Sequence, residues 1–505
     1  VVPGYYHRLN ADSAVEKSTC CENTASEHDM MRKLMIDSVV TWARDYKVDG
    51  FRFDLMGHHM LEDMIAVRAA LDALTVEQDG VDGKSIYVYG EGWDFGEVAN
   101  NARGKNATQL NIAGTGIGVF NDRLRDAVRG GSPFSDPREQ GFATGLVLTN
   151  NENEAREAED QQIQLNNYTD WIRLGLAGNL AGYELIRADG KTVPGRLVPY
   201  NSAPAGYTDD PQENIVYVSA HDNQTLFDAI QAKAPAEATI ADRVRMNNLA
   251  VSIVMFSQGI PFFHAGDDIL RSKSFNPNSY NSGDWYNRLD WTYESNNWGV
   301  GLPLEGTGQW DIYKPLLADP ALAPTRADIE SASAVFREFL QIRKSSRLFR
   351  LETAGQIENV VSFYNNGPEQ IPGLIVMRLT DAENLDPVHE EIVILFNARP
   401  EPVTFSDPAF AGKNFTLNPI QQESNDPVVR DSTFDSTGGT FTVPARTTAV
   451  FNILREPVPG PTAVPTQQET PVAADSNVLL TLAGVIGGFA ALAALMLALR
   501  KRENK

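Results

Sequence analysis

Three apolar segments of the sequence each end on a carboxylate. The segment VDGFRFD ends at Asp54, SIYVYGE ends at Glu91, and NIVYVSAHD ends at Asp222. An ionised carboxylate beside a buried strand costs free energy unless a charge or hydrogen bond compensates it, so three such endings predict a functional cluster. Clustered carboxylates with few basic neighbours suit either metal binding or glycoside hydrolysis through an oxocarbenium-like transition state. The three residues alone leave that choice open.

The neighbours of the first two carboxylates favour glycoside chemistry. Arg52 precedes Asp54 by two residues, so both side chains face the same way on a strand, and the guanidinium can keep a nucleophilic carboxylate ionised. Trp93 and Phe95 follow Glu91, where aromatic rings can stack on sugars and raise the pKa of a carboxylic acid. Plainer roles exist for each residue: a helix cap for Asp54, a structural ion pair for Arg52 and core packing for Trp93.

The metal alternative would rest on His58, His59, His221 and Asp222. Metal-dependent hydrolases of barrel type need histidines that converge on one ion. His58 and His59 are consecutive, so their side chains diverge, and a strand-borne H-x-H motif is missing from the sequence. We therefore predict no catalytic metal, and we expect His221 to donate a hydrogen bond to a sugar hydroxyl.

Alternating strand and helix patterns position these residues. Strands are predicted at 48–54, 86–91, 214–222 and 260–267, and helices at 27–47, 58–74, 121–131, 169–180, 243–259 and 333–349. Continuous apolar strands that alternate with helices predict a parallel sheet covered by helices. In a parallel barrel the carboxyl ends of the strands open onto one face, where active sites lie. The three carboxylates should therefore meet at one pocket.

The pattern changes after about residue 350. Short strands are predicted at 358–366, 373–381, 390–398, 402–408 and 439–453, with turns between them and no helices. This pattern is typical of a small antiparallel β-sandwich.

The C-terminus contains a long uncharged segment. Residues 478–499 carry no charge and are long enough to span a bilayer, and Arg500, Lys501, Arg502 and Lys505 follow directly. We predict a transmembrane helix whose basic tail (500–505) is cytoplasmic, which leaves the preceding chain extracellular and anchored to the membrane. A buried helix of a soluble protein is the alternative. Residues 456–477, rich in Pro and Thr, are predicted to be an extended linker.

Composition narrows the class of protein further. The chain has 505 residues and a net charge of −23, which argues against a nucleic-acid partner. Its two cysteines, Cys20 and Cys21, are adjacent, so a disulfide framework is excluded. We expect two thiols in a loop; a vicinal disulfide is a strained alternative.

Three motifs resemble conserved regions of a known superfamily. GFRFD, GEGW and SAHDN, in this order, are similar to the second to fourth conserved regions of the α-amylase superfamily of glycoside hydrolases (family 13). The flanking segments VVPGYYHRLN, STCCENTASEH, YGEGWDFGEVANNARG, GTGIGVFNDRLRDAVRGGSPF and NSYNSGDWYNRLDW resemble pullulanase-type α-1,6-glucosidases, including plant limit dextrinases. The resemblance runs almost continuously from Val1 to about Trp291.

This resemblance implies specific roles. Asp54 would be the nucleophile that forms a glycosyl-enzyme, Glu91 the general acid and then the general base, and Asp222 the stabiliser of the transition state. The pocket would be lined by Arg52, Trp93, Phe95, His221, Asp284 and Trp285. The bond cleaved would be the α-1,6 branch linkage of pullulan, amylopectin or limit dextrins, with retention. No cofactor is required, and the sequence does not specify a structural calcium site.

One departure from the family affects the expected fold. The first conserved region, of D-x-V-Y-N-H type, does not occur in the sequence. We therefore expect residues 1–350 to form part of a (β/α)8 barrel, about strands 4–8, followed by the β-sandwich (351–455) and the transmembrane helix. We also expect such a chain to have little activity alone. The competing hypothesis is a membrane-anchored glycan-binding protein or an inactive truncated homologue, although binding alone would not need all three carboxylates.

Overall fold

The computed structural model describes residues 2–153 and 156–456. The chain divides into two units, Val1–Arg455 and Glu456–Lys505. Apart from Glu456, the second unit lies outside the described residues, and so do the predicted linker, transmembrane helix and basic tail.

The predicted fold requires one correction. Among the described residues, no helix is long and apolar enough to cross a membrane. The longest described helices, α11 (Arg326–Ser345) and α6 (Ala158–Leu176), carry charged side chains along their length, which are costly in hydrocarbon. This finding is the correction to the predicted fold: the described residues give no support for a transmembrane helix or for the membrane as a partner. The range 478–499 itself lies outside the described residues, and the extracellular location stays a prediction.

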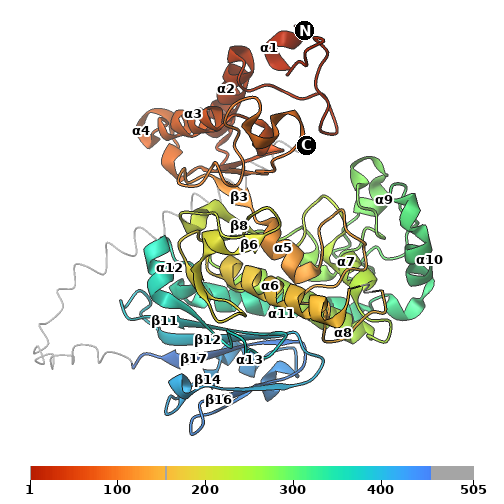
Figure 1. The fold of residues 1–505 in the computed structure, drawn as a ribbon, viewed down its shortest axis with the longest axis vertical. Helices are drawn as coiled ribbons and strands as arrows, with labels where there is room; N and C mark the ends of the chain where they lie inside the picture. Colours follow the sequence, from red (N-terminus) through yellow and green to blue (C-terminus); the bar gives the residue numbers. More distant parts are fainter. Residues whose placement is uncertain (1, 154–155, 457–505) are drawn as a thin grey trace, which may run out of the picture. The chain divides into compact units, whose positions relative to one another are not determined.

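A five-stranded parallel sheet forms the centre of the N-terminal part (Figure 1). Its strands, in spatial order, are β1 (Gly50–Phe53), β2 (Tyr87–Gly90), β3 (Gly118–Phe120), β8 (Asn214–Val216) and β9 (Ile260–Pro261). Spatial order follows chain order, and every neighbouring pair is parallel. All carboxyl ends therefore lie at one edge. The sheet is open, because β1 and β9 each pair with one strand only.

Helices connect and cover these strands. The longer ones are α2 (Asp29–Tyr46), α3 (Leu61–Asp72), α5 (Asp122–Arg129), α6, α7 (Leu226–Lys233), α8 (Ile240–Phe256), α10 (Trp310–Ala318) and α11. The shorter ones are α1 (Pro3–Tyr6), α4 (Val76–Asp79), α9 (Asp284–Asn287), α12 (Ala354–Val360) and α13 (Pro419–Gln422). Capping boxes begin α8 at Thr239 and α11 at Thr325, where the side chains satisfy backbone N–H groups that have no partner within the helix.

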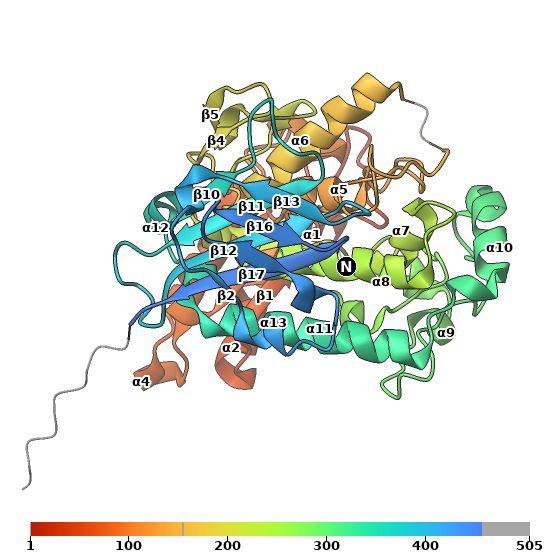
Figure 2. The ribbon, with the colours of Figure 1, turned by 90° about the horizontal axis from the view of Figure 1, so that it is seen from below.

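The C-terminal part consists of two antiparallel sheets (Figure 2). One has the order β10-β11-β12-β17-β14 and the other β13-β16-β15. Their bounds are β10 (Val361–Tyr364), β11 (Leu374–Thr380), β12 (His389–Asn397), β13 (Val403–Ser406), β14 (Thr416–Leu417), β15 (Thr433–Asp435), β16 (Thr440–Val443) and β17 (Thr447–Leu454). Phe410, Phe441 and Phe451 pack between the sheets. Two-stranded ribbons, β4 (Glu184–Ile186) with β5 (Thr192–Pro194) and β6 (Pro199–Tyr200) with β7 (Ala203–Pro204), complete the strands.

One hydrophobic core joins the helices to the five-stranded C-terminal sheet. It contains side chains from α5, α6, α8, α11, β11 and β12. The ring of Phe256 on α8 lies 5.2 Å from that of Phe349 and 6.4 Å from that of Phe396 on β12. Helix α8 accordingly contacts β12 and β17. The boundary predicted between residues 350 and 351 stays a prediction, since residues 1–455 form one compact unit.

Candidate active site

The three carboxylates lie beyond the carboxyl ends of three parallel strands. Asp54 follows β1 directly, Glu91 follows β2 directly, and Asp222 lies six residues after β8. The register pairs Phe53 with Gly90, so the first two carboxylates leave adjacent strands at the same level. Each apolar strand ends at the edge of the sheet, so the carboxylate that follows it reaches the open side where active sites of parallel barrels lie.

One arginine holds the first two carboxylates together. Nη1 of Arg52 lies 2.8 Å from Oδ1 of Asp54, and its Nη2 lies 2.9 Å from Oε1 of Glu91. The backbone N–H of Leu55 donates to Oε2 of Glu91 at 2.9 Å. Leu55 has φ +44°, a left-handed conformation that is unfavourable for a leucine. Such strain is typical of functional sites, and here it aims the N–H at the carboxylate.

The environments of these carboxylates differ sharply. The side chain of Glu91 is 11% exposed, whereas that of Asp54 is 70% exposed. Burial raises the pKa of Glu91, the charges of Asp54 and Asp222 raise it further, and the hydrogen bond from Leu55 and the charge of Arg52 oppose this rise. Two carboxyl groups in unlike environments suit an acid paired with a charged nucleophile.

Asp222 belongs to a loop that is held by buried groups. Its Oδ1 lies 3.4 Å from Nε2 of His221. The buried Lys273 donates from Nζ to the backbone oxygen of His221 at 2.8 Å, and the N–H of Asn223 donates to the backbone oxygen of Pro277 at 2.8 Å. Burial lowers the pKa of Lys273 to about 8. These contacts fix the backbone on both sides of Asp222.

A second buried contact lies just before this loop. Ser219 donates from Oγ to Oδ1 of Asp267 at 2.7 Å, and the N–H of His264 donates to Oδ2 at 3.1 Å. Burial raises the pKa of Asp267 to about 7. Asp267 thus connects the ends of the two last parallel strands, β8 and β9.

A cleft of about 1260 Å³ opens at the carboxyl edge of the sheet. Six predicted site residues line it: Arg52, Glu91, Trp93, Phe95, His221 and Asp222. Asp54 lies beside them through its ion pair with Arg52. Asp284 and Trp285, on α9, are not in this lining, and Trp285 is 57% exposed. The structure therefore brings together seven of the nine predicted residues.

Other lining residues were not predicted from the sequence. Tyr89, Phe120, Tyr217 and Phe262 contribute an aromatic floor, and α5 contributes Arg125, Asp126 and Arg129. Alternation along the strands could have found the aromatic floor. The charges on α5 gave a weaker signal, since a short helix with charges on several sides is normally solvated. Here Arg125 donates to the hydroxyl of Tyr217 at 2.6 Å and pairs with Asp126.

The described residues contain no group of three or more His, Cys, Asp or Glu side chains arranged to hold a metal ion. His58 and His59 are both buried, and burial lowers their pKa values. His58 packs against Phe95, with ring centroids 4.6 Å apart. These histidines support the cleft wall through packing.

Comparisons with known proteins agree with this geometry. Residues 293–453 match the family described as "Alpha-1,6-glucosidases, pullulanase-type, C-terminal". The chain is 50% identical to pullulanase 1, chloroplastic, of Arabidopsis thaliana over 461 residues, which are 89% of this chain and 48% of the relative. It is 40% identical to the pullulanase of Klebsiella pneumoniae over 465 residues, 90% of this chain and 41% of the relative.

A solved structure shares the fold. A maltotriose complex of the Klebsiella pneumoniae enzyme superimposes with a TM-score of 0.84 at 40% identity, covering 90% of this chain and 48% of that one. The chain thus spans about half the length, or less, of the relatives it matches. Together with the motifs at Asp54, Glu91 and Asp222, these matches show that the chain belongs to the pullulanase-type α-1,6-glucosidases of the α-amylase superfamily, glycoside hydrolase family 13.

Proposed function

We propose that the chain supplies the catalytic carboxylates of an enzyme that hydrolyses α-1,6 linkages in α-glucans such as pullulan, amylopectin and limit dextrins. The observation that carries this proposal is the single Arg52 guanidinium shared by Asp54 and Glu91 at adjacent strand ends. Relatives named pullulanase and a similar structure described as a maltotriose complex support the substrate class. Because the chain covers about half of those relatives, activity of the whole protein is part of the proposal.

In the first step, the protonated Glu91 donates its proton to the glycosidic oxygen, and the carboxylate of Asp54 attacks the anomeric carbon. The glycosidic bond breaks and a glycosyl ester forms on Asp54. The negative charge of Asp222 stabilises the positive charge that develops on the sugar. Burial raises the pKa of Glu91, which favours the protonated form that this step requires.

In the second step, the Glu91 carboxylate takes a proton from water, and the resulting hydroxyl attacks the same carbon and releases Asp54. Two inversions give net retention of configuration. The proton and the nucleophile both come from the chain, so this scheme requires no cofactor; a structural calcium ion would lie outside it.

The cleft residues have binding roles in this proposal. Trp93 and Phe95 offer rings for stacking on glucose units, and His221 offers a hydrogen-bond donor. Asp284 and Trp285 lie outside the cleft lining, so they remain predicted contacts only for a glucan that extends beyond it.

Replacement of the nucleophile tests the proposal. The protein translated from its complete gene should release maltotriose from pullulan, and Asp54→Asn should nearly abolish turnover while pullulan binding survives. Asp49→Asn, an exposed aspartate at the opposite end of β1, is the matched control and should retain full activity. Near-normal turnover in Asp54→Asn would disprove the assignment. Binding of pullulan by the wild type without hydrolysis would favour the glycan-binding alternative.

A further inference from the structure

A buried arginine lies behind the two loops that carry the candidate nucleophile and the candidate acid. The nucleophile loop (54–59) follows β1 and begins at Asp54, and the acid loop (91–101) follows β2 and begins at Glu91. Arg8 belongs to neither loop, lies outside the cleft lining and is only 2% exposed. The proposed mechanism gives this buried charge no role.

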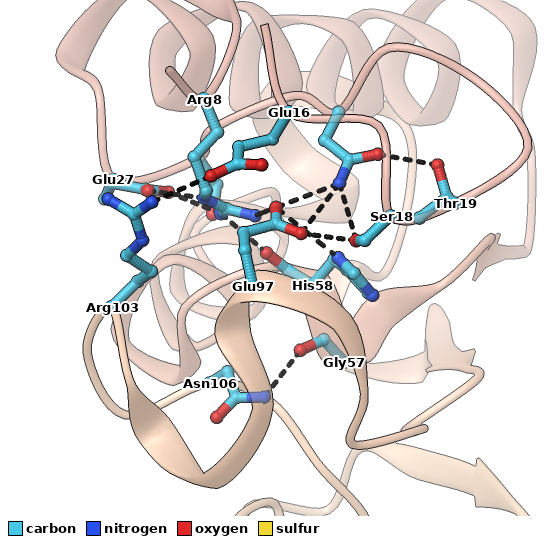
Figure 3. Close-up of polar contacts among 12 residues, drawn as sticks. Arg8, Glu16, Ser18, Thr19, Glu27, Gly57, His58, Glu97, Arg103 and Asn106 are labelled. Carbon is cyan, nitrogen blue, oxygen red and sulfur yellow. Dashed lines mark hydrogen bonds and ion pairs between the residues drawn. The ribbon is translucent and has the colours of Figure 1, made fainter. Parts of the chain in front are cut away.

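The guanidinium of Arg8 contacts both loops at once (Figure 3). Its Nη1 donates to Oε1 of Glu97 in the acid loop at 2.9 Å, and its Nη2 donates to the backbone oxygen of His58 in the nucleophile loop at 2.8 Å. The edge formed by Nε and Nη2 holds Glu27, because each nitrogen donates to one carboxylate oxygen at 2.8 Å. Every nitrogen of the side chain therefore has a partner, and a planar fork suits these three groups better than a point charge.

The carboxylate of Glu97 is a firm anchor for this guanidinium. Burial opposes the ionisation of the carboxylate, but hydrogen bonds from Ser18, Asn23 and Arg8 lower its pKa to about 2, so it stays negative near neutral pH. The backbone of Arg8 is fixed as well. Its N–H donates to the backbone oxygen of Asn23 at 3.0 Å, and its own oxygen accepts from the N–H of Glu16 at 2.9 Å. Arg8 thus has a set position relative to the acid loop.

The two loops also contact each other directly. The N–H of Gly57 donates to the backbone oxygen of Glu91 at 2.8 Å. Nδ2 of Asn106 donates to the backbone oxygen of Gly57 at 2.8 Å, a contact that Figure 3 also shows. Arg8 binds His58, the residue that follows Gly57, and therefore holds this contact between the loops from behind.

The strained residue Leu55 depends on this support. Its left-handed backbone aims its N–H at Oε2 of Glu91, and such strain persists only where the surrounding structure over-determines it. The N–H of His58 donates to the backbone oxygen of Leu55 at 2.8 Å, and the backbone oxygen of His58 accepts from Arg8. One turn of the chain therefore connects the guanidinium to the hydrogen bond on Glu91.

We propose that Arg8 is a positioning residue for the reaction: it holds the nucleophile loop and the acid loop together, and so maintains the hydrogen bond from Leu55 to Glu91. Because Arg8 lies outside the cleft lining, it acts through the backbone of His58 and the carboxylate of Glu97. This inference rests on the proposed function, since the acid role of Glu91 belongs to it.

The pH profile of Arg8→Met tests this role. Loss of the guanidinium should relax the strained backbone and remove its hydrogen bond to Glu91, a bond that opposes the rise which burial causes in the pKa of that group. The charges that act on this group, those of Arg52, Asp54 and Asp222, stay in place, so its pKa should rise further. In the protein translated from its complete gene, kcat/KM for pullulan should fall by about 10- to 100-fold, and its alkaline limb should shift to higher pH.

Matched variants separate this role from a general loss of stability. Arg103→Met removes an exposed arginine that pairs with Glu16 at 2.9 Å just after the acid loop (Figure 3), and it should leave the profile unchanged. Arg243→Met removes another buried guanidinium, 1% exposed, which donates to the backbone oxygen of Pro235 outside the cleft lining. It should destabilise the protein without moving the alkaline limb. Arg8→Lys keeps the charge but not the fork, so it should shift the limb in the same direction by a smaller amount.

Two kinetic outcomes would overturn the proposal. One is an unchanged limb in Arg8→Met or, where that variant does not fold, in Arg8→Lys. The other is an equal shift in Arg103→Met or Arg243→Met, which would show that any loss of an arginine has the same effect.

Hydrogen exchange tests the contact without any activity. In Arg8→Met the backbone amides of residues 54–59 and 96–101 should exchange several-fold faster than in the wild type, whereas Arg243→Met should leave both segments at wild-type rates. Unchanged exchange in both segments of Arg8→Met would overturn the proposal. If the wild type does not hydrolyse pullulan, the proposed function fails, while the exchange rates still decide whether Arg8 holds the two loops together.

Discussion

At the scale of single residues, Arg52 decides how the site works. Its guanidinium contacts Asp54 and Glu91 at once, so one positive charge compensates both carboxyl groups. The order along the strand predicted the contact of Arg52 with Asp54 correctly. It could not predict the contact with Glu91, because Glu91 follows β2, the next parallel strand along the chain, and the contact depends on the register between β1 and β2.

Removal of this charge should move the pH profile. The positive charge of Arg52 opposes the rise of the Glu91 pKa, so in Arg52→Gln that pKa should rise further. Glu91 then keeps its proton to higher pH, and the alkaline limb of kcat/KM should shift upward while the maximum rate falls. Arg44→Gln, which affects an exposed arginine paired with Asp45, is the control. An unchanged alkaline limb in Arg52→Gln would show that the charge of Arg52 does not influence the pKa of Glu91.

Asp267 should make stability depend on pH. Its pKa is raised to about 7 in the folded state, above the ordinary value of about 4. The folded state therefore binds the proton more tightly than the unfolded state, so this group's contribution to stability decreases as the pH rises from about 4 to about 7.

In Asp267→Asn the amide can donate to Ser219 and accept from the N–H of His264, so the contacts persist. Urea midpoints measured between pH 4 and pH 8 should decrease less with rising pH in the variant than in the wild type. Parallel pH dependences in the two proteins would contradict this role.

At the scale of elements, the first residues of the strands were more predictable than their lengths. The apolar segment 214–222 predicts a long strand, whereas β8 covers only Asn214–Val216. After Val216, hydrogen bonds with side chains replace the pairing between strands. Arg129 donates to the backbone oxygen of Val218 at 3.1 Å, and Ser219 donates to Asp267. Such contacts come from distant parts of the chain, and no local pattern encodes them. Helices with a clear apolar period were predicted well, as at 27–47 for α2, because periodicity is local. The helix predicted at 169–180 covers only the second half of α6, and the expectation of no helices after residue 350 was wrong, since α12 and α13 lie there.

Close packing between two loops gives a prediction at this scale. A Cβ at Gly57 would lie 2.1 Å from the backbone oxygen of Trp93. Gly57→Ala should therefore displace the loop that carries Trp93, raise the KM for pullulan and destabilise the protein by about 1–3 kcal/mol. Gly355→Ala, in α12 with open space around it, should be neutral or slightly stabilising. Equal behaviour of the two variants in urea denaturation would contradict the close approach.

At the scale of the whole molecule, the sequence showed the change from an α/β pattern to an antiparallel β pattern. It did not show that the two parts share one hydrophobic core. Composition predicts a division near residue 350. The structure has one core that contains Phe256, Phe349 and Phe396 from both sides of this position, and the boundary itself stays a prediction. The matched family region, residues 293–453, also begins upstream of α11 and not at the change of pattern.

This shared core predicts cooperative unfolding of residues 1–455. Phe396→Ala should cost about 3–5 kcal/mol and lower the stability of the helices as well as the sheets. Phe134→Ala, which removes a ring that is 98% exposed, should change stability by less than about 0.5 kcal/mol. Circular dichroism and tryptophan fluorescence should report one common transition in urea. Separate transitions in Phe396→Ala would show that the two parts unfold independently.

The same core sets a rule for recombination between relatives. A chimaera joined near residue 350 would combine Phe256 from one parent with Phe396 from another. The side chains that pack against each other in the shared core would then come from different proteins and would no longer be complementary. Crossovers placed before α8 would keep both faces from one parent. In a chimaera, the carboxyl-terminal sheets should therefore come from the same parent as α8 and α11. Loops around Trp93 and Asn278, which line the cleft, are the places to exchange when the aim is to transfer substrate preference between relatives.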